Sequence, residues 1–336
     1  LGPRKVLGVV GGTGRGDYDP SKIRAVLRVL DVVPMRAELQ SFLERGADYT
    51  MTPRPAMLRL ATRVPGLSNP PSMRKIYRPG IQQLSRMTDA RRRVLETFQS
   101  YGGLAFTLKE LADIAGVSPT VIKGMVALGA VQEEDTPLDL PFARLNTEYA
   151  QTTLTRDQDS AAAALITGLK AQNYGTTLLK GVTGSGKTEV YLEAVAECLR
   201  QSRQALVLLP EIALTAEFLD RVEARFGTRP AEWHSGVTLT ERRRVWKMVG
   251  QGGAQMVIGA RSALFLPYQN LGLIVVDEEH DSSYKQEDGV LYNARDMAVL
   301  RASICGARVV LASATPSLES WANAEAKKYQ YVELSS

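Results

Sequence analysis

Residues 176–200, TTLLKGVTGSGKTEVYLEAVAECLR, guide the interpretation of the whole chain. A short apolar run leads into the loop 181–188, which has the pattern G-x-x-x-x-G-K-[ST], and apolar residues at helical spacing follow it at once. A strand, a glycine-rich loop and a helix in this order are typical of a phosphate-binding site. The glycines let backbone N–H groups converge on phosphate oxygens, and the N-terminus of the helix adds partial positive charge. The stretch therefore predicts a site for a nucleoside triphosphate.

The side chains around this loop have separate expected roles. Lys187 can reach the β- and γ-phosphates of ATP, and the Thr188 hydroxyl can ligate Mg²⁺. Gln158 can recognise the adenine edge, because its amide both donates and accepts hydrogen bonds. A glycine-rich turn that binds nothing is the alternative, and it would not explain the flanking strand and helix. The predicted nucleotide-binding residues are Gln158, Gly181, Val182, Thr183, Gly184, Ser185, Gly186, Lys187 and Thr188.

A second stretch, IVVDEEH at 274–280, has an apolar strand that ends in acidic residues. Asp277 is expected to hold Mg²⁺, directly or through water, and Glu278 to polarise the water that attacks the γ-phosphate. His280 would lie where it can sense the state of the nucleotide. An acidic strand end that faces solvent is the alternative. Lys187, Asp277 and Glu278 are therefore the predicted catalytic residues.

Six stretches in this order resemble the helicase motifs of superfamily 2, and in detail the family of replication-restart helicases: GVTGSGKTEVY, LLPEIALT, HSG, IGARSALF, VVDEEHDSSYKQ and LASATPSLES. The resemblance implies an ATP-dependent 3′-to-5′ DNA helicase that acts in replication restart and primosome assembly at branched DNA. It implies ATP and Mg²⁺ as cofactors. It also implies forked and single-stranded DNA, primosome proteins and single-stranded DNA-binding protein as partners. We expect a monomer in the bacterial cytoplasm.

The resemblance also assigns DNA contacts to particular residues. Arg261 would supply charge and Ser262 a hydroxyl for the DNA backbone. Tyr284 and Tyr292 would stack on bases of single-stranded DNA, with Lys285 beside them. From the residues alone, both tyrosines could instead be packing residues. Residues 313–315 resemble the motif that couples ATP hydrolysis to strand movement.

The sequence departs from the family pattern, because the second helicase lobe is missing. The arginine that completes the ATPase site and the cysteine-rich zinc-binding insertion are missing with that lobe. We therefore expect no zinc site in this chain. Cys198 and Cys305 are expected to be buried thiols. The chain begins with Leu1 rather than Met, and we expect it to be a fragment that binds ATP weakly and hydrolyses it little. No residue of a pocket for a DNA 3′ end is assigned.

Charge is distributed unevenly along the chain. Residues 1–100 contain 18 lysines and arginines against 8 aspartates and glutamates, although the net charge of the whole chain is only +5. A basic N-terminal region favours a polyanionic partner, and a solvated basic surface without a partner is the alternative. No apolar run is long enough to predict a membrane span, so no membrane partner is expected.

The fold class that these patterns predict is α/β, with a RecA-like P-loop lobe whose strands form a parallel sheet. A winged-helix domain and a small basic N-terminal β+α DNA-binding module are expected before it. The N-terminal module would contain a strand at 5–10 and helices at 36–45 and 56–61. A strand is favoured at 23–33, with a helix as the open alternative. The expected boundaries are 1–70 for the N-terminal module, 71–87 for a linker, 88–145 for the winged helix and 146–336 for the helicase lobe.

Two alternative functions stay open at this stage. One is a double-stranded DNA translocase that does not separate strands, and the other is a DNA-binding module with a vestigial ATP site. The helix at 119–128 would be the recognition helix of the winged helix, but it carries only Lys123 as a side chain that could reach a base or a phosphate. Packing or non-specific contact is therefore favoured over sequence-specific binding by this helix.

Overall fold

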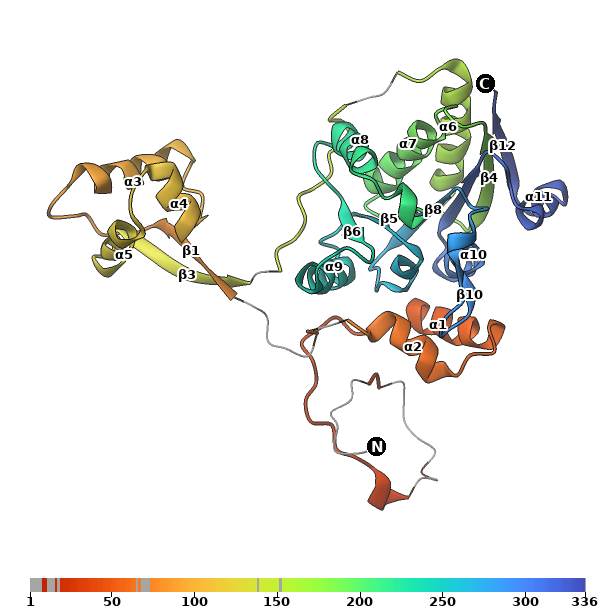
Figure 1. The fold of residues 1–336 in the computed structure, drawn as a ribbon, viewed down its shortest axis with the longest axis horizontal. Coiled ribbons are helices and arrows are strands. Elements are labelled where there is room, and N and C mark those ends of the chain that lie inside the picture. The colour runs from red at the N-terminus through yellow and green to blue at the C-terminus, as the bar shows by residue number, and fades with distance from the viewer. Residues whose placement is uncertain are drawn as a thin grey trace. The chain divides into compact units, whose positions relative to one another are not determined.

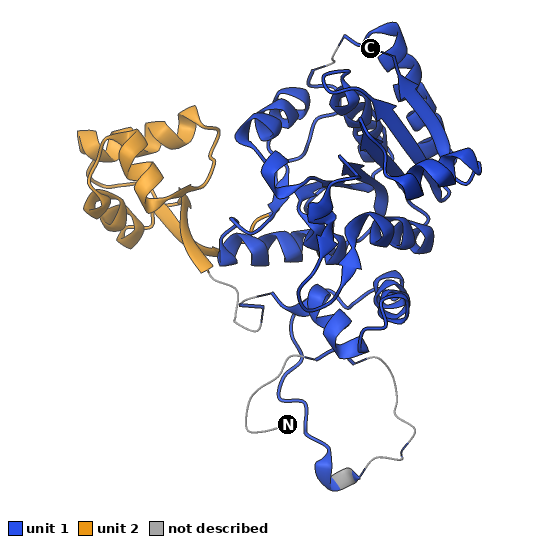
Figure 2. Cartoon of the chain, turned by 45° about the vertical axis from the view of Figure 1, so that its right-hand side comes forward, with its two compact units in different colours: residues 1–68, 141–336 blue, residues 69–140 orange. Residues whose placement is uncertain are grey.

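The computed structural model describes residues 8–10, 16, 19–64, 66–67, 73–137, 139–150 and 153–335. Figure 1 labels their helices and strands. The chain divides into two compact units, residues 1–68 together with 141–336, and residues 69–140 (Figure 2). The sequence predicted a separate module over 1–70, whereas the structure joins 1–68 to the nucleotide-binding lobe.

In the described residues, a seven-stranded parallel sheet lies at the centre of the larger unit. Its strands are β4 (Gly175–Gly181), β5 (Gln204–Leu208), β6 (Ala231–Trp233), β7 (Met256–Gly259), β8 (Leu271–Asp277), β11 (Arg308–Ser313) and β12 (Gln330–Leu334). Their order is β12-β4-β11-β8-β5-β7-β6, and all neighbours pair in parallel (Figure 1). This confirms the predicted α/β class, and it brings the carboxyl ends of β4 and β8 to the same edge.

Successive residues of the central strands face two separate hydrophobic cores. Ile274 and Val276 belong to one core, and Leu273 and Val275 belong to the other. The second core is covered by α6 (Arg156–Lys170), α7 (Lys187–Arg200) and α8 (Ala216–Phe226), and the first by α9 (Leu239–Gln251) and α10 (Ala294–Cys305). Burial on both faces explains why these strands are continuous apolar runs. The last described helix is α11 (Leu318–Glu325).

Two N-terminal helices, α1 (Ala37–Tyr49) and α2 (Arg54–Thr62), belong to the first core of the lobe. The Phe42 ring on α1 lies 5.5 Å from the Phe265 ring, centroid to centroid. The indole of Trp246 on α9 donates a hydrogen bond to the Ala61 carbonyl of α2, at 2.9 Å. Both predicted helices are confirmed, but their apolar faces pack on the lobe instead of forming a module of their own.

The prediction of a strand at 23–33 was wrong. These residues form neither a strand nor a helix, and Val26 and Val29 are exposed. A strand needs a hydrogen-bonded neighbour, and within the described residues none pairs with this segment. Of the other predicted strand, at 5–10, residues 8–10 form none and residues 5–7 lie outside the described residues.

The smaller unit contains three helices around a small antiparallel sheet in its described part, with the strand order β2-β1-β3. Its core includes Val94, Phe98, Leu111, Ile122 and Met125, which come from all three helices. The elements are β1 (Met73–Pro79), α3 (Asp89–Ser100), β2 (Phe106–Thr107), α4 (Leu108–Ala115), α5 (Pro119–Ala127) and β3 (Val131–Pro137). The winged-helix assignment stays a prediction.

The linker predicted over 71–87 was wrong for residues 73–79. These residues form β1, which pairs with β3 along its whole length and buries Ile76 and Tyr77. The prolines in this region suggested a linker. Pro79, however, is the last residue of the strand, where a missing N–H is tolerated.

The sequence also predicted two buried thiols and no membrane span. Cys198 is buried and Cys305 is half-buried, and both are free thiols. Within the described residues, no helix combines the length and the apolar character needed to cross a membrane.

Candidate nucleotide site

The predicted phosphate loop connects the end of β4 to the start of α7. Gly184 and Gly186 both have a φ of 84°, in the left-handed region that favours glycine. A Cβ on Gly186 would also collide with the amide of Gln158. The loop therefore needs glycine at these positions for both its backbone conformation and its close approach to a neighbouring side chain.

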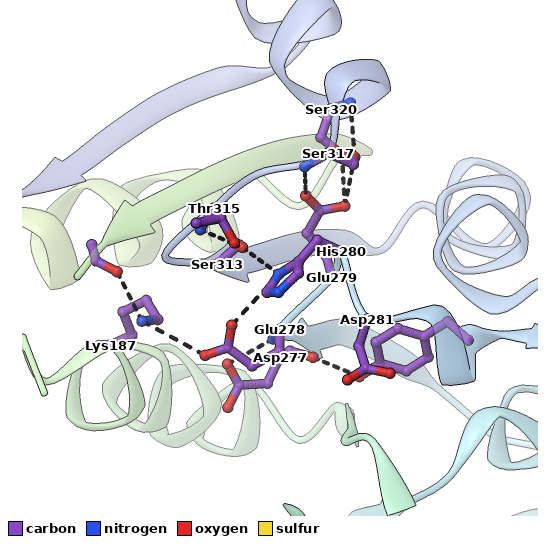
Figure 3. A network of polar contacts seen from close by, with 12 residues as sticks. Lys187, Asp277, Glu278, Glu279, His280, Asp281, Ser313, Thr315, Ser317 and Ser320 are labelled. Atoms are coloured by element: carbon purple, nitrogen blue, oxygen red, sulfur yellow. Dashed lines mark hydrogen bonds and ion pairs between the residues drawn. The ribbon is translucent and has the colours of Figure 1, made fainter. Parts of the chain in front are cut away.

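Lys187 lies inside this loop and is only 7% exposed. Its Nζ donates to the carbonyl oxygens of Gly181, at 2.8 Å, and Val182, at 3.3 Å, and lies 3.8 Å from a carboxylate oxygen of Glu278. Figure 3 shows Lys187 between the loop and the acidic turn. Ser185 Oγ is buried and has no hydrogen-bond partner among the described residues. An ammonium group and an unpaired hydroxyl facing one loop fit the oxygens of a phosphate group.

The acidic turn begins where β8 ends, at Asp277. Its carboxylate accepts hydrogen bonds from the hydroxyl of Tyr191 and from the backbone N–H of Glu278, both at 3.0 Å. Burial raises the pKa of Asp277 to about 6, and the neighbouring charge of Glu278 adds to this effect. The two predicted Mg²⁺ ligands, the Thr188 hydroxyl and the buried Asp277 carboxylate, are oxygen donors of the kind that Mg²⁺ prefers.

His280 connects the acidic turn to the strand β11. Its Nδ1 lies 2.7 Å from Ser313 Oγ, which also accepts a hydrogen bond from the backbone N–H of Thr315 at 3.0 Å (Figure 3). The same imidazole nitrogen is 3.6 Å from the Glu278 carboxylate. His280 therefore connects residues 313–315, which the family resemblance associates with coupling, to the predicted catalytic carboxylate.

Glu279 is a residue of this turn for which the sequence predicted no role. It is 2% exposed, and its carboxylate accepts hydrogen bonds from Ser317, Ser320 and Arg295. Among three consecutive acidic residues, no sequence signal shows which one faces the interior.

Gln158 lies beside the phosphate loop. It occupies the first turn of α6, where its Oε1 accepts from the Thr155 backbone N–H at 3.0 Å and its Nε2 donates to the Ser185 carbonyl at 2.9 Å. Both ends of the amide are therefore engaged in fixing the helix start to the loop. Its predicted recognition of adenine stays a prediction.

The predicted DNA contacts fall into two groups. Arg261, Ser262 and Lys285 all lie at or near the carboxyl edge of the sheet. Arg261 donates from Nη1 to the carbonyls of Ser283, at 2.7 Å, and Lys285, at 3.1 Å, and Ser262 Oγ accepts from the Trp233 indole at 3.0 Å. These three residues stay predicted DNA contacts.

The structure corrects the prediction for Tyr284 and Tyr292, which are 1% and 6% exposed and so have no free face for a base. The hydroxyl of Tyr284 is close to the carbonyls of Asp277, at 2.6 Å, and Leu208, at 3.0 Å. The ring of Tyr292 packs edge-on against that of Phe265 at 5.2 Å. Their polar neighbours in sequence suggested exposure, but packing against the lobe core decides their position.

The region that contains this site is similar to known proteins. The family model of DEAD/DEAH box helicases matches residues 155–324. The replication restart protein PriA of Rickettsia felis is 44% identical over 200 residues, which is 60% of this chain and 30% of that protein. PriA of Bacillus subtilis is 38% identical over 234 residues, which is 69% of this chain and 29% of that protein. The chain thus spans about a third of the length of these relatives.

Among solved structures, a hypothetical ATP-dependent RNA helicase from Sulfolobus tokodaii is similar at 18% identity, with a TM-score of 0.40. The match covers 55% of this chain and 54% of that one.

Proposed function

We propose that this chain, which belongs to the DEAD/DEAH box helicase family, binds Mg·ATP at residues 181–188 and carries half of the ATPase site of a replication-restart DNA helicase. The observation that carries the proposal is the position of Lys187. Its ammonium group lies between the carbonyls of the phosphate loop and the carboxylate of Glu278, 3.8 Å away. The loop and the acidic turn therefore form one site.

Each residue of this site has a proposed task. Lys187 would exchange its loop carbonyls for phosphate oxygens, and Thr188 and Asp277 would hold the metal ion. Mg²⁺ supplies charge neutralisation on the phosphates when it is bound. Tyr191 would keep the Asp277 carboxylate in place through the hydrogen bond at 3.0 Å. Glu278 would orient the attacking water, as general-base residues of this reaction class do.

The finer parts of the function rest on the similarity to PriA proteins. We propose 3′-to-5′ movement on forked and single-stranded DNA, and assembly with primosome proteins and single-stranded DNA-binding protein, in a bacterial cytoplasm and as a monomer. Arg261, Ser262 and Lys285 are the proposed DNA contacts. The unit of residues 69–140 contains most of the winged-helix domain predicted at 88–145. We propose that this domain makes packing or non-specific contacts, because α5 carries only Lys123 as a cation.

The test measures release of labelled phosphate from ATP by the chain, with and without forked DNA. We expect slow hydrolysis that forked DNA accelerates and that Glu278→Gln abolishes. The matched control is Glu287→Gln, which changes an exposed carboxylate in the same region and should hydrolyse ATP as the unmodified chain does. Equal hydrolysis by Glu278→Gln and the unmodified chain would contradict the proposed role of the acidic turn.

A separate measurement compares the binding of tailed and blunt DNA. A fluorescently labelled duplex with a 3′ tail should bind the chain more tightly than the blunt duplex of the same sequence. Preference for blunt duplex would instead favour the alternative of a double-stranded DNA translocase.

A further inference from the structure

Glu279 is the most buried carboxylate of the acidic turn, and it is fully enclosed by hydrogen-bond donors. One carboxylate oxygen accepts from the backbone N–H of Ser317 at 2.7 Å. The other accepts from the hydroxyls of Ser317 and Ser320, both at 2.9 Å (Figure 3). It also accepts from Arg295 Nη1 at 3.3 Å. A buried charge is stable only with such compensation, and here the donors come from segments far apart in the sequence.

The donors belong to the starts of two helices. Ser317 is the N-cap of α11, and Ser320 lies in its first turn. Arg295 lies in the first turn of α10, where it also pairs with Asp296 at 2.9 Å and with Glu319 of α11 at 3.5 Å. Glu279 therefore joins the acidic turn to the N-termini of both helices at once.

The neighbours of Glu279 in the chain belong to the predicted ATPase site. Glu278, directly before it, has a φ of 46°, which is uncommon for a residue other than glycine. Such a conformation persists when the surroundings hold it in place. The backbone N–H of Glu279 donates to the Ala312 carbonyl of β11 at 3.0 Å, so both the backbone and the side chain of Glu279 are fixed immediately after Glu278.

We propose that Glu279 is a positioning residue that holds Glu278 in its place beside Lys187 and couples the nucleotide site to α11. The inference rests on the proposed nucleotide binding. When phosphate displaces Lys187 from the loop carbonyls, the contact between Lys187 and Glu278 changes, and the turn can move only together with the donors that hold Glu279. Arg295 and the two serines transmit this movement to α10 and α11. A purely structural role would stabilise the fold without linking these helices to the nucleotide.

The probe for the coupling is Trp321, which lies on α11 one residue after Ser320. The chain has three tryptophans, so incorporation of 5-fluorotryptophan gives three fluorine resonances, which Trp→Phe variants assign. Mg·ATP is titrated into the chain, and its dissociation constant is measured in parallel with a fluorescent ATP analogue. We expect Mg·ATP to shift the Trp321 resonance of the unmodified chain.

The variants separate coupling from folding and from binding. Glu279→Ala removes every carboxylate contact to α10 and α11, and it should reduce the nucleotide-induced shift of Trp321 by more than about half while the chain still binds Mg·ATP. Glu279→Gln keeps the shape and part of the hydrogen bonding, so its shift should be intermediate. Ser320→Ala removes one contact and should give a smaller reduction. Glu287→Ala, at an exposed carboxylate, is the matched control and should leave the shift unchanged.

Three outcomes would contradict the proposal. The first is an undiminished Trp321 shift in Glu279→Ala, which would mean that the signal reaches α11 by another route, such as β4. The second is nucleotide binding without any Trp321 shift in the unmodified chain. The third is a Trp321 shift that decreases across the variants only in proportion to their loss of thermal stability, as a purely structural role of Glu279 would give. If Glu279→Ala does not fold, Glu279→Gln and Ser320→Ala decide by the same criteria. Failure of the unmodified chain to bind Mg·ATP would refute the proposed function and this inference with it, and the binding measurement identifies that case.

Discussion

Phe42 tests whether α1 is part of the core of the nucleotide-binding lobe. Its ring is fully buried, with the Phe265 ring at 5.5 Å and the Arg301 guanidinium at 5.4 Å from the ring centroid. Truncating a buried phenylalanine to alanine costs about 3–5 kcal/mol. We expect about 3 kcal/mol for Phe42→Ala, because water entering the space would solvate Arg301 and offset part of the loss. Nε and Nη1 of Arg301 donate to no nitrogen or oxygen atom of the described residues.

The assay is urea unfolding of the chain, followed by tryptophan fluorescence. Trp246 reports on the packing of the neighbouring helix α2 on the lobe, because its indole donates to the Ala61 carbonyl of α2. Phe98→Ala is the matched control, since Phe98 is equally buried but lies in the unit of residues 69–140. It should destabilise that unit and leave the transition of the lobe unchanged. An unchanged lobe transition in Phe42→Ala would refute the packing argument and favour an independent N-terminal module.

Two further predictions concern single polar contacts. Tyr284→Phe should cost about 1–3 kcal/mol of lobe stability in urea unfolding, because it removes a buried donor from the carbonyls of Asp277 and Leu208. Tyr292→Phe is its control and should be neutral or stabilising, because the Tyr292 hydroxyl is buried without a hydrogen-bond partner in the described residues. Equal losses of lobe stability in both variants would contradict this explanation. Thr107→Ala removes the capping box of α4 and should lower the stability of the smaller unit by about 1 kcal/mol, which thermal unfolding of that unit measures; an unchanged transition would show that the cap contributes nothing.

The parallel sheet could be predicted because its strands depend on local sequence. The run 271–277 is apolar at almost every position, as a strand buried on both faces must be. The segment 23–33 is also rich in apolar residues, yet it forms no strand. The difference lies in the neighbours: β8 pairs with β5 and β11, whereas no described strand pairs with 23–33. Pairing between distant segments is not encoded in the local pattern.

The nucleotide site could be predicted only in part, for a similar reason. Lys187, Asp277 and Glu278 come together because the carboxyl ends of parallel strands share one edge, and the glycine loop has a distinctive sequence. The burial of Glu279 and Tyr284 depends on donors and acceptors from other elements, such as Ser317 and Leu208. Both residues stand in polar sequence, which gives no local signal of burial.

Residues 181–188 are proposed to bind the phosphates of ATP, and the affinity of Lys187→Ala for Mg·ATP measures how much this loop contributes. Lys187 is expected to make charge-assisted hydrogen bonds to phosphate oxygens, and their loss should weaken binding by about 2 kcal/mol or more, which is about 30-fold in the dissociation constant. Lys180→Ala is the control, because Lys180 on β4 pairs with Glu333 at 3.2 Å instead of facing the loop. We expect normal affinity for Lys180→Ala and at least about a 30-fold loss for Lys187→Ala. Equal affinity of Lys187→Ala and the unmodified chain would contradict it.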